Sequence, residues 1–209
     1  MKILSHRGYW QTETEKNTIE AFIRSFQLGF GTETDIRDRN GQLVISHDPP
    51  TNEACSIEKF LEIYKQHGEG LPLALNIKAD GLQKTLQQIL LDYNIHNYFV
   101  FDMSIPDTLS YLRNHMNFLI RESEYEKELP FYANSIGVWL DCFEGEWITQ
   151  IDIKKHLDAN KIVCLVSPDL HKREYKSFWA KISDWELHKN DSLMICTDYP
   201  ETARLFFNG

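Results

Sequence analysis

The chain has 209 residues, of which 42% are hydrophobic and 25% charged, and this composition is typical of one soluble globular domain spanning residues 1–209. Its net charge of −9 disfavours nucleic acid or an anionic membrane surface as a partner, because both require a basic surface. The first ten residues lack the apolar stretch of a signal peptide, and no apolar run is long enough for a membrane span. We therefore expect a cytoplasmic protein without integral membrane association, whose oligomeric state the sequence does not indicate.

Eight short β-rich segments recur along the chain, and helical periods lie between them. In chain order the predicted strands are Lys2–Ser5, Thr32–Arg37, Leu73–Lys78, Tyr98–Asp102, Phe118–Arg121, Ile136–Asp141, Ile162–Ser167 and Leu193–Thr197. Parallel strands need crossover helices, so this alternation predicts an α/β fold with a parallel sheet. Eight repeats favour a closed (β/α)8 TIM barrel, and 209 residues leave room only for minimal loops.

The intervening helices are predicted from their apolar spacing. Ile19, Phe22, Ile23 and Phe26 follow the i, i+3, i+4, i+7 pattern of a buried helix face. Asn17 and Glu20 have the spacing of a capping box, and Gly29 is a stop signal. Further apolar stripes predict helices over residues 82–93, 179–185 and 203–207. The acidic segment Glu122–Leu129 is only weakly periodic, and a helix is predicted there on the least evidence.

The four cysteines, Cys55, Cys142, Cys164 and Cys196, are far apart and form no CxxC pair. Three of them lie in apolar, strand-like surroundings. This pattern predicts reduced thiols in a cytoplasmic protein more readily than disulfides.

Polar side chains gather where the first two predicted strands end, which is where a barrel carries its chemistry. His6 and Arg7 follow the first strand, and His47 follows a short apolar run after the turn dipeptide Asn40-Gly41. Glu33 and Asp35 are spaced i, i+2, so both point to one face of their strand. Two buried carboxylates would repel unless a cation lies between them, and Mg²⁺ or Ca²⁺ takes such oxygen ligands. The alternative is that both acids face solvent on an edge strand.

The third strand ends with Asn76 and Lys78, again on one face. Asn76 has a neutral oxygen for a metal, and Lys78 has a positive charge for an anionic group. Later strand ends offer weaker candidates for substrate contacts: Asp102, Arg121, Trp139, Asp141 and His171. A buried Trp is more often part of the core than of a pocket.

An ordered set of motifs in residues 1–50 resembles the N-terminal signature of the glycerophosphodiester phosphodiesterases. The matching segments are His6-Arg7-Gly8, Glu15-Lys16-Asn17-Thr18 with Ala21-Phe22, Gly31-Thr32-Glu33-Thr34-Asp35, and Asn40-Gly41 with His47-Asp48-Pro49. The segment Ile195–Glu201 is similar to the closing strand and turn of that family, and the resemblance is weak in between.

The resemblance implies a TIM barrel with one catalytic divalent cation, Mg²⁺ or Ca²⁺, acting on a small phosphodiester. It implies His6 and His47 as the acid/base pair, a role suited to the side chain whose ordinary pKa of about 6.5 is closest to neutrality. Arg7 and Lys78 would contact the phosphate. Glu33 and Asp35 would bind the metal. Arg121 and Trp139 are added as candidates for substrate binding.

The chain departs from the family pattern in two places. The third metal carboxylate of the family is Asn76 here, which makes the set of metal ligands one charge less negative. Only 29 positions separate His47 from Asn76 (76 − 47), too few for the inserted subdomain that typical members carry. In lacking this subdomain the chain is similar to the sphingomyelinase D branch of the superfamily, which nevertheless keeps the acid.

The sequence thus predicts a metal-dependent phosphodiester hydrolase that uses two histidines. One alternative is a catalytically inactive barrel that binds a phosphate ligand, which Asn76 favours and the retained histidines disfavour. A sugar-phosphate isomerase or aldolase barrel is a third hypothesis. It would need a Gly-rich phosphate loop, and Ser167-Pro168-Asp169-Leu170 does not provide one.

Overall fold

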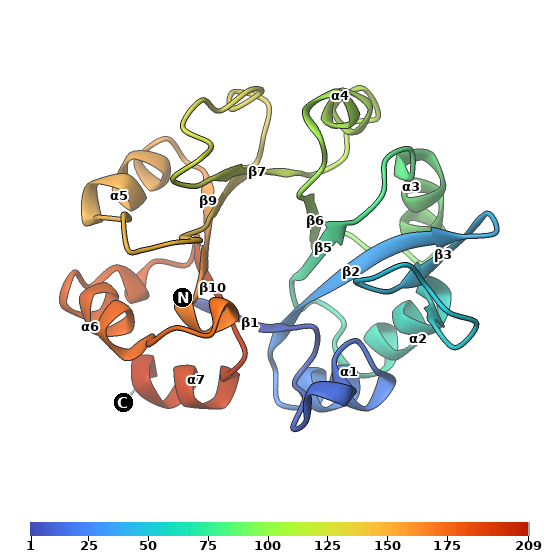
Figure 1. The fold of residues 1–209 in the computed structure, drawn as a ribbon, viewed down its shortest axis with the longest axis horizontal. Coiled ribbons are helices and arrows are strands. Elements are labelled where there is room, and N and C mark those ends of the chain that lie inside the picture. Colours follow the sequence, from blue (N-terminus) through green and yellow to red (C-terminus); the bar gives the residue numbers. More distant parts are fainter. Residues whose placement is uncertain (209) are drawn as a thin grey trace. The chain divides into compact units, whose positions relative to one another are not determined.

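Strands and helices alternate through the computed structural model, which describes residues 1–208. The elements in chain order are β1 (Lys2–His6), η1 (Glu13–Glu15), α1 (Ile19–Gln27), β2 (Gly31–Arg39), β3 (Gln42–Ile45), β4 (Cys55–Ser56), α2 (Ile57–His67), β5 (Leu73–Ile77), α3 (Gln83–Asp92), β6 (Tyr98–Phe101), α4 (Ile105–Arg113), β7 (Leu119–Glu122), β8 (Gly137–Leu140), α5 (Gln150–Asp158), β9 (Ile162–Val166), η2 (Pro168–His171), α6 (Lys176–Asp184), η3 (Leu187–Lys189), β10 (Leu193–Thr197) and α7 (Pro200–Asn208). All eight predicted strands are present within one or two residues of their predicted bounds (Figure 1).

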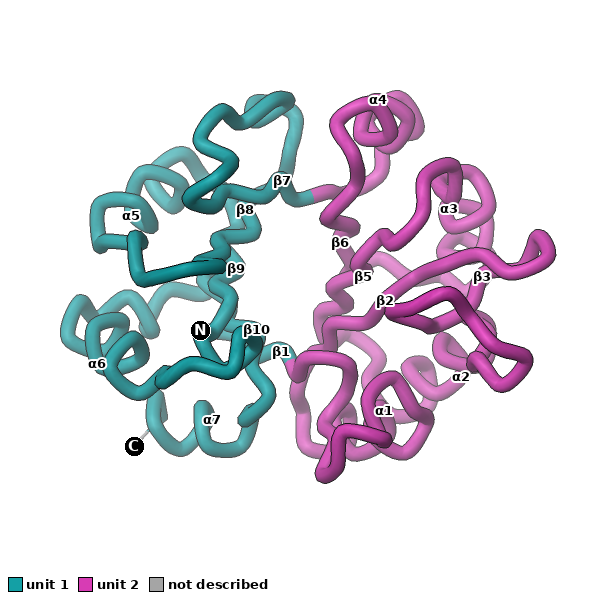
Figure 2. Tube along the Cα trace, viewed as in Figure 1, with its two compact units in different colours: residues 1–4, 119–209 teal, residues 5–118 magenta. Residues whose placement is uncertain are grey.

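Two compact units make up the chain, residues 5–118 and residues 1–4 with the chain from residue 119 onward (Figure 2). Following the figure, we call the second of these unit 1 and residues 5–118 unit 2. The single domain expected from the sequence stays a prediction. None of the helices in residues 1–208 has the length and apolar character needed to cross a membrane.

Unit 2 contains a mixed sheet in the order β4-β3-β2-β5-β6. Strands β2, β5 and β6 are parallel, and Figure 1 shows helices α1 to α4 on one side of them. The chain reverses at Asn40-Gly41, where both residues have positive φ (51° and 81°), as a tight hairpin turn requires. The apolar run after this turn becomes β3, antiparallel to β2. This hairpin brings His47 back beside the strand that carries the two acids.

Helices α1 and α2 of unit 2 pack through aromatic side chains. The Phe22 ring of α1 meets the Phe60 ring of α2 edge-on, with centroids 4.7 Å apart, and Phe26 meets Tyr64 at 5.5 Å. The predicted apolar face of α1 is therefore confirmed, but its predicted capping box is wrong. Thr18 is the N-cap, because its hydroxyl accepts the Ala21 amide hydrogen at 3.4 Å. Asn17 lies outside the helix.

Unit 1 contains the parallel strands β7, β8, β9 and β10, and helices α5, α6 and α7 connect or follow them. The helix predicted over Glu122–Leu129 is wrong, since that segment has no helical residues. The Glu124 carboxylate instead accepts hydrogen bonds from the backbone amides of Phe143, Glu144 and Gly145. All four cysteines are free, as predicted, and only Cys55 is not fully buried.

Candidate active site

Strand β2 places the two predicted acids in the interior of unit 2. Glu33 and Asp35 are 2% and 0% exposed, and β2 lies between β3 and β5 in the sheet. The alternative of an exposed edge strand is therefore wrong. Their i, i+2 spacing directs both carboxylates to the same face.

Positive and hydrogen-bonding groups from three other segments converge on Asp35. The Arg7 Nε atom lies 3.0 Å from Asp35 Oδ2, and the Asn17 side-chain amide donates to the same oxygen at 2.9 Å. Lys78 Nζ lies 3.5 Å from Asp35 Oδ1 and 3.9 Å from Asp102 Oδ2. Two cations therefore stand beside one fully buried carboxylate, a cluster able to hold an anionic group.

Glu33 is held less firmly than Asp35. Its Oε2 accepts the Arg7 backbone amide hydrogen at 3.2 Å. Burial, and next the neighbouring charge of Asp35, raise the pKa of Glu33 to about 7, while His6, Arg7 and Lys78 oppose the rise. Burial and a neighbouring negative charge both disfavour the ionised form of a carboxyl group.

Asn76 stands directly beside Asp35, because the two residues are partners in the parallel register of β2 and β5. Asn76 Oδ1 and Asp35 Oδ1 are both buried, and neither accepts a hydrogen bond. Buried oxygens of this kind normally have partners. Two such oxygens on adjacent strands, with the Glu33 carboxylate nearby, fit a hard divalent cation.

A cation site formed by Glu33 and Asp35 would need the amide oxygen of Asn76 as its third protein ligand. Within residues 1–208, no group of three or more His, Cys, Asp or Glu side chains is placed to hold a metal ion. Glu33, Asp35 and Asn76 together would give only two formal negative charges, and Arg7 and Lys78 already lie against Asp35.

The segment after β1 has an unusual backbone that explains several motif residues. Arg7, Gly8 and Asn17 have positive φ (59°, 81° and 61°), a region that non-glycine residues seldom adopt. A side chain at Gly8 would approach the Ala21 Cβ to 2.8 Å. The Asn17 backbone amide donates to the Arg7 carbonyl at 2.9 Å. Asn17 therefore fixes the backbone of Arg7, while its side-chain amide binds Asp35. The sequence placed Asn17 in a helix cap and in a motif shared with the phosphodiesterases, but did not assign it to the site.

The two predicted acid/base histidines lie on different segments of unit 2. His6 ends β1, and its charge acts on Glu33. His47 follows β3, its side chain is 44% exposed, and its Nδ1 lies 2.9 Å from Asp48 Oδ1. The Arg37 Nε atom donates to the His47 carbonyl at 2.9 Å.

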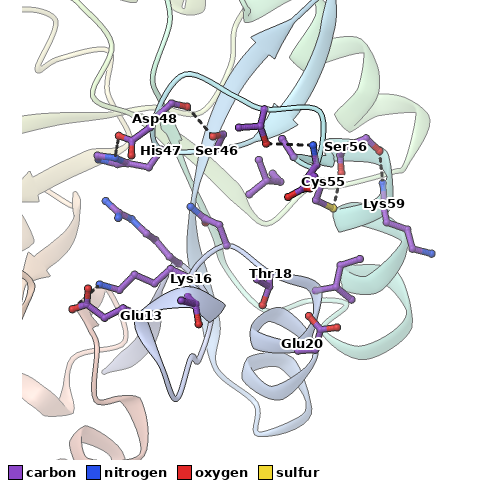
Figure 3. A pocket seen from close by; sticks show the side chains of 18 of the residues that line it. Glu13, Lys16, Thr18, Glu20, Ser46, His47, Asp48, Cys55, Ser56 and Lys59 are labelled. Atoms are coloured by element: carbon purple, nitrogen blue, oxygen red, sulfur yellow. Dashed lines mark hydrogen bonds and ion pairs between the residues drawn. The ribbon is translucent and has the colours of Figure 1, made fainter.

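A groove of about 790 Å³ opens beside this cluster. His47, Arg7 and Asn17 contribute to its lining, and His6 does not. Figure 3 shows two facing walls, one carrying Glu13, Lys16, Thr18 and Glu20, and the other carrying Ser46, His47, Asp48, Cys55, Ser56 and Lys59.

Four weaker site candidates belong to unit 1, and two of them, Asp141 and His171, pair with each other at 2.7 Å. Arg121 is engaged by Glu126, with Nε and Nη2 at 2.5 and 3.0 Å from its carboxylate oxygens. Trp139 is 4% exposed on β8. Their role in substrate binding stays a prediction.

Comparison with known proteins identifies the fold. No family model matches the chain, and no curated protein matches it by sequence. Among solved structures, a glycerophosphodiester phosphodiesterase from Agrobacterium tumefaciens is similar, with 14% identity, a TM-score of 0.76 and full coverage of both chains. A phosphodiesterase from Oleispira antarctica, in complex with the product sn-glycerol-3-phosphate, has 13% identity and a TM-score of 0.76 over 100% of this chain and 97% of its own.

A more distant similarity extends to a Ca²⁺-dependent phosphatidylinositol-specific phospholipase C from Streptomyces antibioticus. It has 9% identity and a TM-score of 0.62 over 99% of this chain and 95% of its own. The chain therefore has the α/β fold of the TIM-barrel phosphodiesterases. The fold that the sequence motifs predicted is confirmed.

Proposed function

We propose that the chain is a phosphoric diester hydrolase that cleaves a glycerophosphodiester-like substrate with the help of one divalent cation. The observation that carries the proposal is the convergence of Arg7, Asn17 and Lys78 on buried Asp35, next to the Asn76 oxygen that accepts no hydrogen bond. The shared fold supports it, since a similar structure holds sn-glycerol-3-phosphate as product. Fold alone does not define activity, and these side chains supply the chemistry.

The charges of the cluster suit a phosphodiester, which carries one negative charge and gains more as it is attacked. Arg7 and Lys78 stand where they would bind the non-bridging oxygens and stabilise that growing charge. A divalent cation held by Glu33, Asp35 and Asn76 would act as a Lewis acid on the same group. The calcium dependence of the distant phospholipase C supports Ca²⁺ as a candidate beside Mg²⁺.

The two histidines complete the proposal as acid and base. His6 takes the proton of the attacking hydroxyl, the new P–O bond forms, and the bond to the leaving alcohol breaks as His47 gives that alcohol a proton. When the attacker is a neighbouring hydroxyl of the substrate, the first product is a cyclic phosphate, which water then opens. Attacking and leaving oxygens lie on opposite sides of phosphorus, so base and acid are expected on different sides of the phosphate. The lining of the groove by His47 without His6 agrees with this assignment.

A panel of phosphodiesters, each tested with Mg²⁺, Ca²⁺, Mn²⁺ and a chelator, tests this proposal, with His6→Ala as the blank. We expect hydrolysis that requires a divalent cation and is absent from the blank. Binding of the diesters without turnover under every condition would support the inactive phosphate-binding barrel instead.

A further inference from the structure

The groove of unit 2 is defined here by its two facing walls, Glu13–Glu20 and Ile45–Lys59. It meets the acid cluster at Arg7 and Asn17, which both contact Asp35, while neither Glu33 nor Asp35 lines it. Its volume of about 790 Å³ is that of a site for a ligand of considerable size, well beyond the room that a glycerol unit needs.

The second wall of the groove exists because of the hairpin after β2. Strands β3 and β4 pair antiparallel, with Ile45 opposite Cys55. The loop between them is tied internally: the Ser46 hydroxyl donates to the Asp48 carbonyl at 2.8 Å, and the Glu53 amide donates to the Thr51 hydroxyl at 3.3 Å. The short segment between His47 and Asn76 therefore forms a preorganised wall.

The chemistry of the lining excludes several kinds of ligand. Its charged side chains are four acids (Glu13, Glu20, Asp48, Glu53) and three bases (Arg7, Lys16, Lys59), so it offers neither a cationic field for an anion nor a strongly acidic one for a cation. None of the described lining residues is aromatic, and a quaternary ammonium group is usually recognised by aromatic rings. The apolar members, Ile19, Ile45, Pro49 and Ala54, are too few to cover a lipid chain.

The two lysines of the lining are already engaged. Lys16 Nζ lies 4.4 Å from the centroid of the Trp10 ring and 3.8 Å from Glu13 Oε1. Lys59 Nζ lies 3.2 Å from Glu62 Oε2. Two of the lining acids, Glu13 and Asp48, are likewise paired, with Lys16 and His47. The hydroxyls of Thr14, Thr18, Ser46, Thr51 and Ser56 already take part in hydrogen bonds within the protein. The carboxylates of Glu20 and Glu53 remain as acceptors, and a hydroxyl that already donates one hydrogen bond can still accept another, so the lining complements a ligand with several hydroxyl groups.

We propose that this groove holds the leaving alcohol of the substrate, and that this alcohol is a neutral polyol of sugar or cyclitol type. The inference rests on the proposed function, because the leaving oxygen must lie beside the residue that protonates it, and His47 lines the groove. Glu20 and Glu53, which line opposite walls, determine this specificity as acceptors for the hydroxyls.

The first test compares two diesters that share glycerol phosphate and differ in the alcohol, inositol in one and choline in the other. We expect kcat/KM at least tenfold higher for the inositol diester. Glu20→Gln and Glu53→Gln should each raise KM for the inositol diester about three- to tenfold, as loss of one strong acceptor does, with kcat nearly unchanged. Glu128→Gln, an exposed acid in unit 1, is the matched control and should change neither constant.

The second test blocks the groove through Cys55, which lines it and is the only cysteine that is not fully buried. A bulky maleimide on Cys55 should lower kcat/KM for the inositol diester at least tenfold and leave a methyl diester within twofold of unlabelled protein. Cys55→Ser treated with the same reagent is the control. Equal loss with both diesters, or no loss with either, would overturn the assignment of the groove.

Binding to His6→Ala separates the two proposals. If no diester is hydrolysed by the intact protein but the inositol diester binds His6→Ala more tightly than the choline diester, the proposed hydrolase function fails and the polyol groove stands. If both diesters are hydrolysed with equal kcat/KM, the hydrolase function stands and the polyol groove fails.

Discussion

Buried acidic side chains lie on strands in both units, but their partners differ. In unit 1, Glu122 is 3% exposed, and each of its oxygens lies 2.8 Å from a nitrogen, of Lys155 and of His156. Burial alone would raise the pKa of Glu122, yet hydrogen bonds from His156 and Lys155 bring it below the ordinary value. In unit 2, the pKa of Glu33 is raised to about 7, and Asp35 Oδ1 accepts no hydrogen bond.

The comparison separates acids that stabilise a fold from acids arranged for a ligand. A buried carboxylate with a hydrogen bond on each oxygen is neutralised within the protein. In the pair Glu33–Asp35 the cations Arg7 and Lys78 lie against Asp35, and the pKa of Glu33 remains raised. Perturbed acids of this kind concentrate at functional sites. Each unit also contains a histidine paired with an acid: His47 with Asp48 in unit 2 and His171 with Asp141 in unit 1, at N–O distances of 2.9 and 2.7 Å. Only His47 is proposed to transfer a proton, so the two histidines can be compared by substitution.

The largest expected effect concerns these histidines. His47→Asn should lower kcat by about 10²–10⁴-fold, because removal of a general acid has that typical effect, and the bell-shaped pH profile of the intact enzyme should lose its alkaline limb. A diester with a p-nitrophenol leaving group needs little protonation and should recover most of the rate. The matched variant His171→Asn should keep kcat within about threefold, because His171 is a candidate for substrate contact and not for proton transfer. Equal losses at the two positions would break the contrast between the units, and rescue of His6→Ala by p-nitrophenol would reverse the roles of base and acid.

The next effect is the pH dependence of stability that Glu33 confers. Its folded pKa of about 7 exceeds the ordinary value, so the folded state keeps a proton that the unfolded state releases. Stability of the metal-free protein should therefore fall as pH rises from 4.5 to 7, by about 3 kcal/mol from this group. Denaturant unfolding of wild type and Glu33→Gln, each with chelator, isolates this contribution as their difference. A difference that does not change between pH 4.5 and 7 would show that Glu33 does not hold a proton in the fold.

Addition of the cation should reverse that trend. A divalent ion binds the ionised carboxylate, so its affinity should rise with pH over the same window. Thermal unfolding with and without Ca²⁺ or Mg²⁺ at pH 5, 6, 7 and 8 measures the increment. An increment that is constant with pH would remove Glu33 from the set of ligands.

A smaller effect is expected in unit 1. Glu122→Gln keeps the shape of the side chain but removes the charge that faces Lys155 and His156, and should lower the free energy of unfolding by roughly 1–3 kcal/mol. At a temperature where the variant is folded, kcat/KM should remain within twofold of wild type. Loss of turnover without loss of stability would show that Glu122 takes part in catalysis, and the distinction between stabilising acids in unit 1 and ligand-binding acids in unit 2 would be wrong.

Features with a local cause were predictable from the sequence. The eight strands follow from β-rich runs, and the common face of Glu33 and Asp35 follows from the period of a strand. The hairpin turn at Asn40-Gly41 follows from the conformational preferences of those two residues.

Features with a tertiary cause were not predictable. Asn17 reaches Asp35 because its backbone takes a left-handed conformation and is tied to Arg7, which no helix-cap rule contains. The helix predicted over Glu122–Leu129 was wrong because Glu124 accepts hydrogen bonds from backbone amides 19 to 21 positions away. The local sequence pattern does not indicate such a contact. The groove walls likewise depend on a hairpin packing opposite a distant segment.

The last prediction concerns Asn76, the residue that departs from the family pattern. Asn76→Asp adds a negative charge beside Asp35, its register partner. In chelator this should lower the stability of the protein, because three acids would then share one buried site. With Ca²⁺ or Mg²⁺ present, the added charge should tighten cation binding about tenfold or more, since ligand charge sets the affinity of such sites. KM for the anionic diester should rise, because the site becomes more negative.

Asn190→Asp, on an exposed loop of unit 1, is the control and should leave cation affinity unchanged. Isothermal titration with each ion measures the outcome, and unchanged affinity in Asn76→Asp would mean that position 76 lies outside the cation site and that its unpartnered oxygen faces the substrate instead.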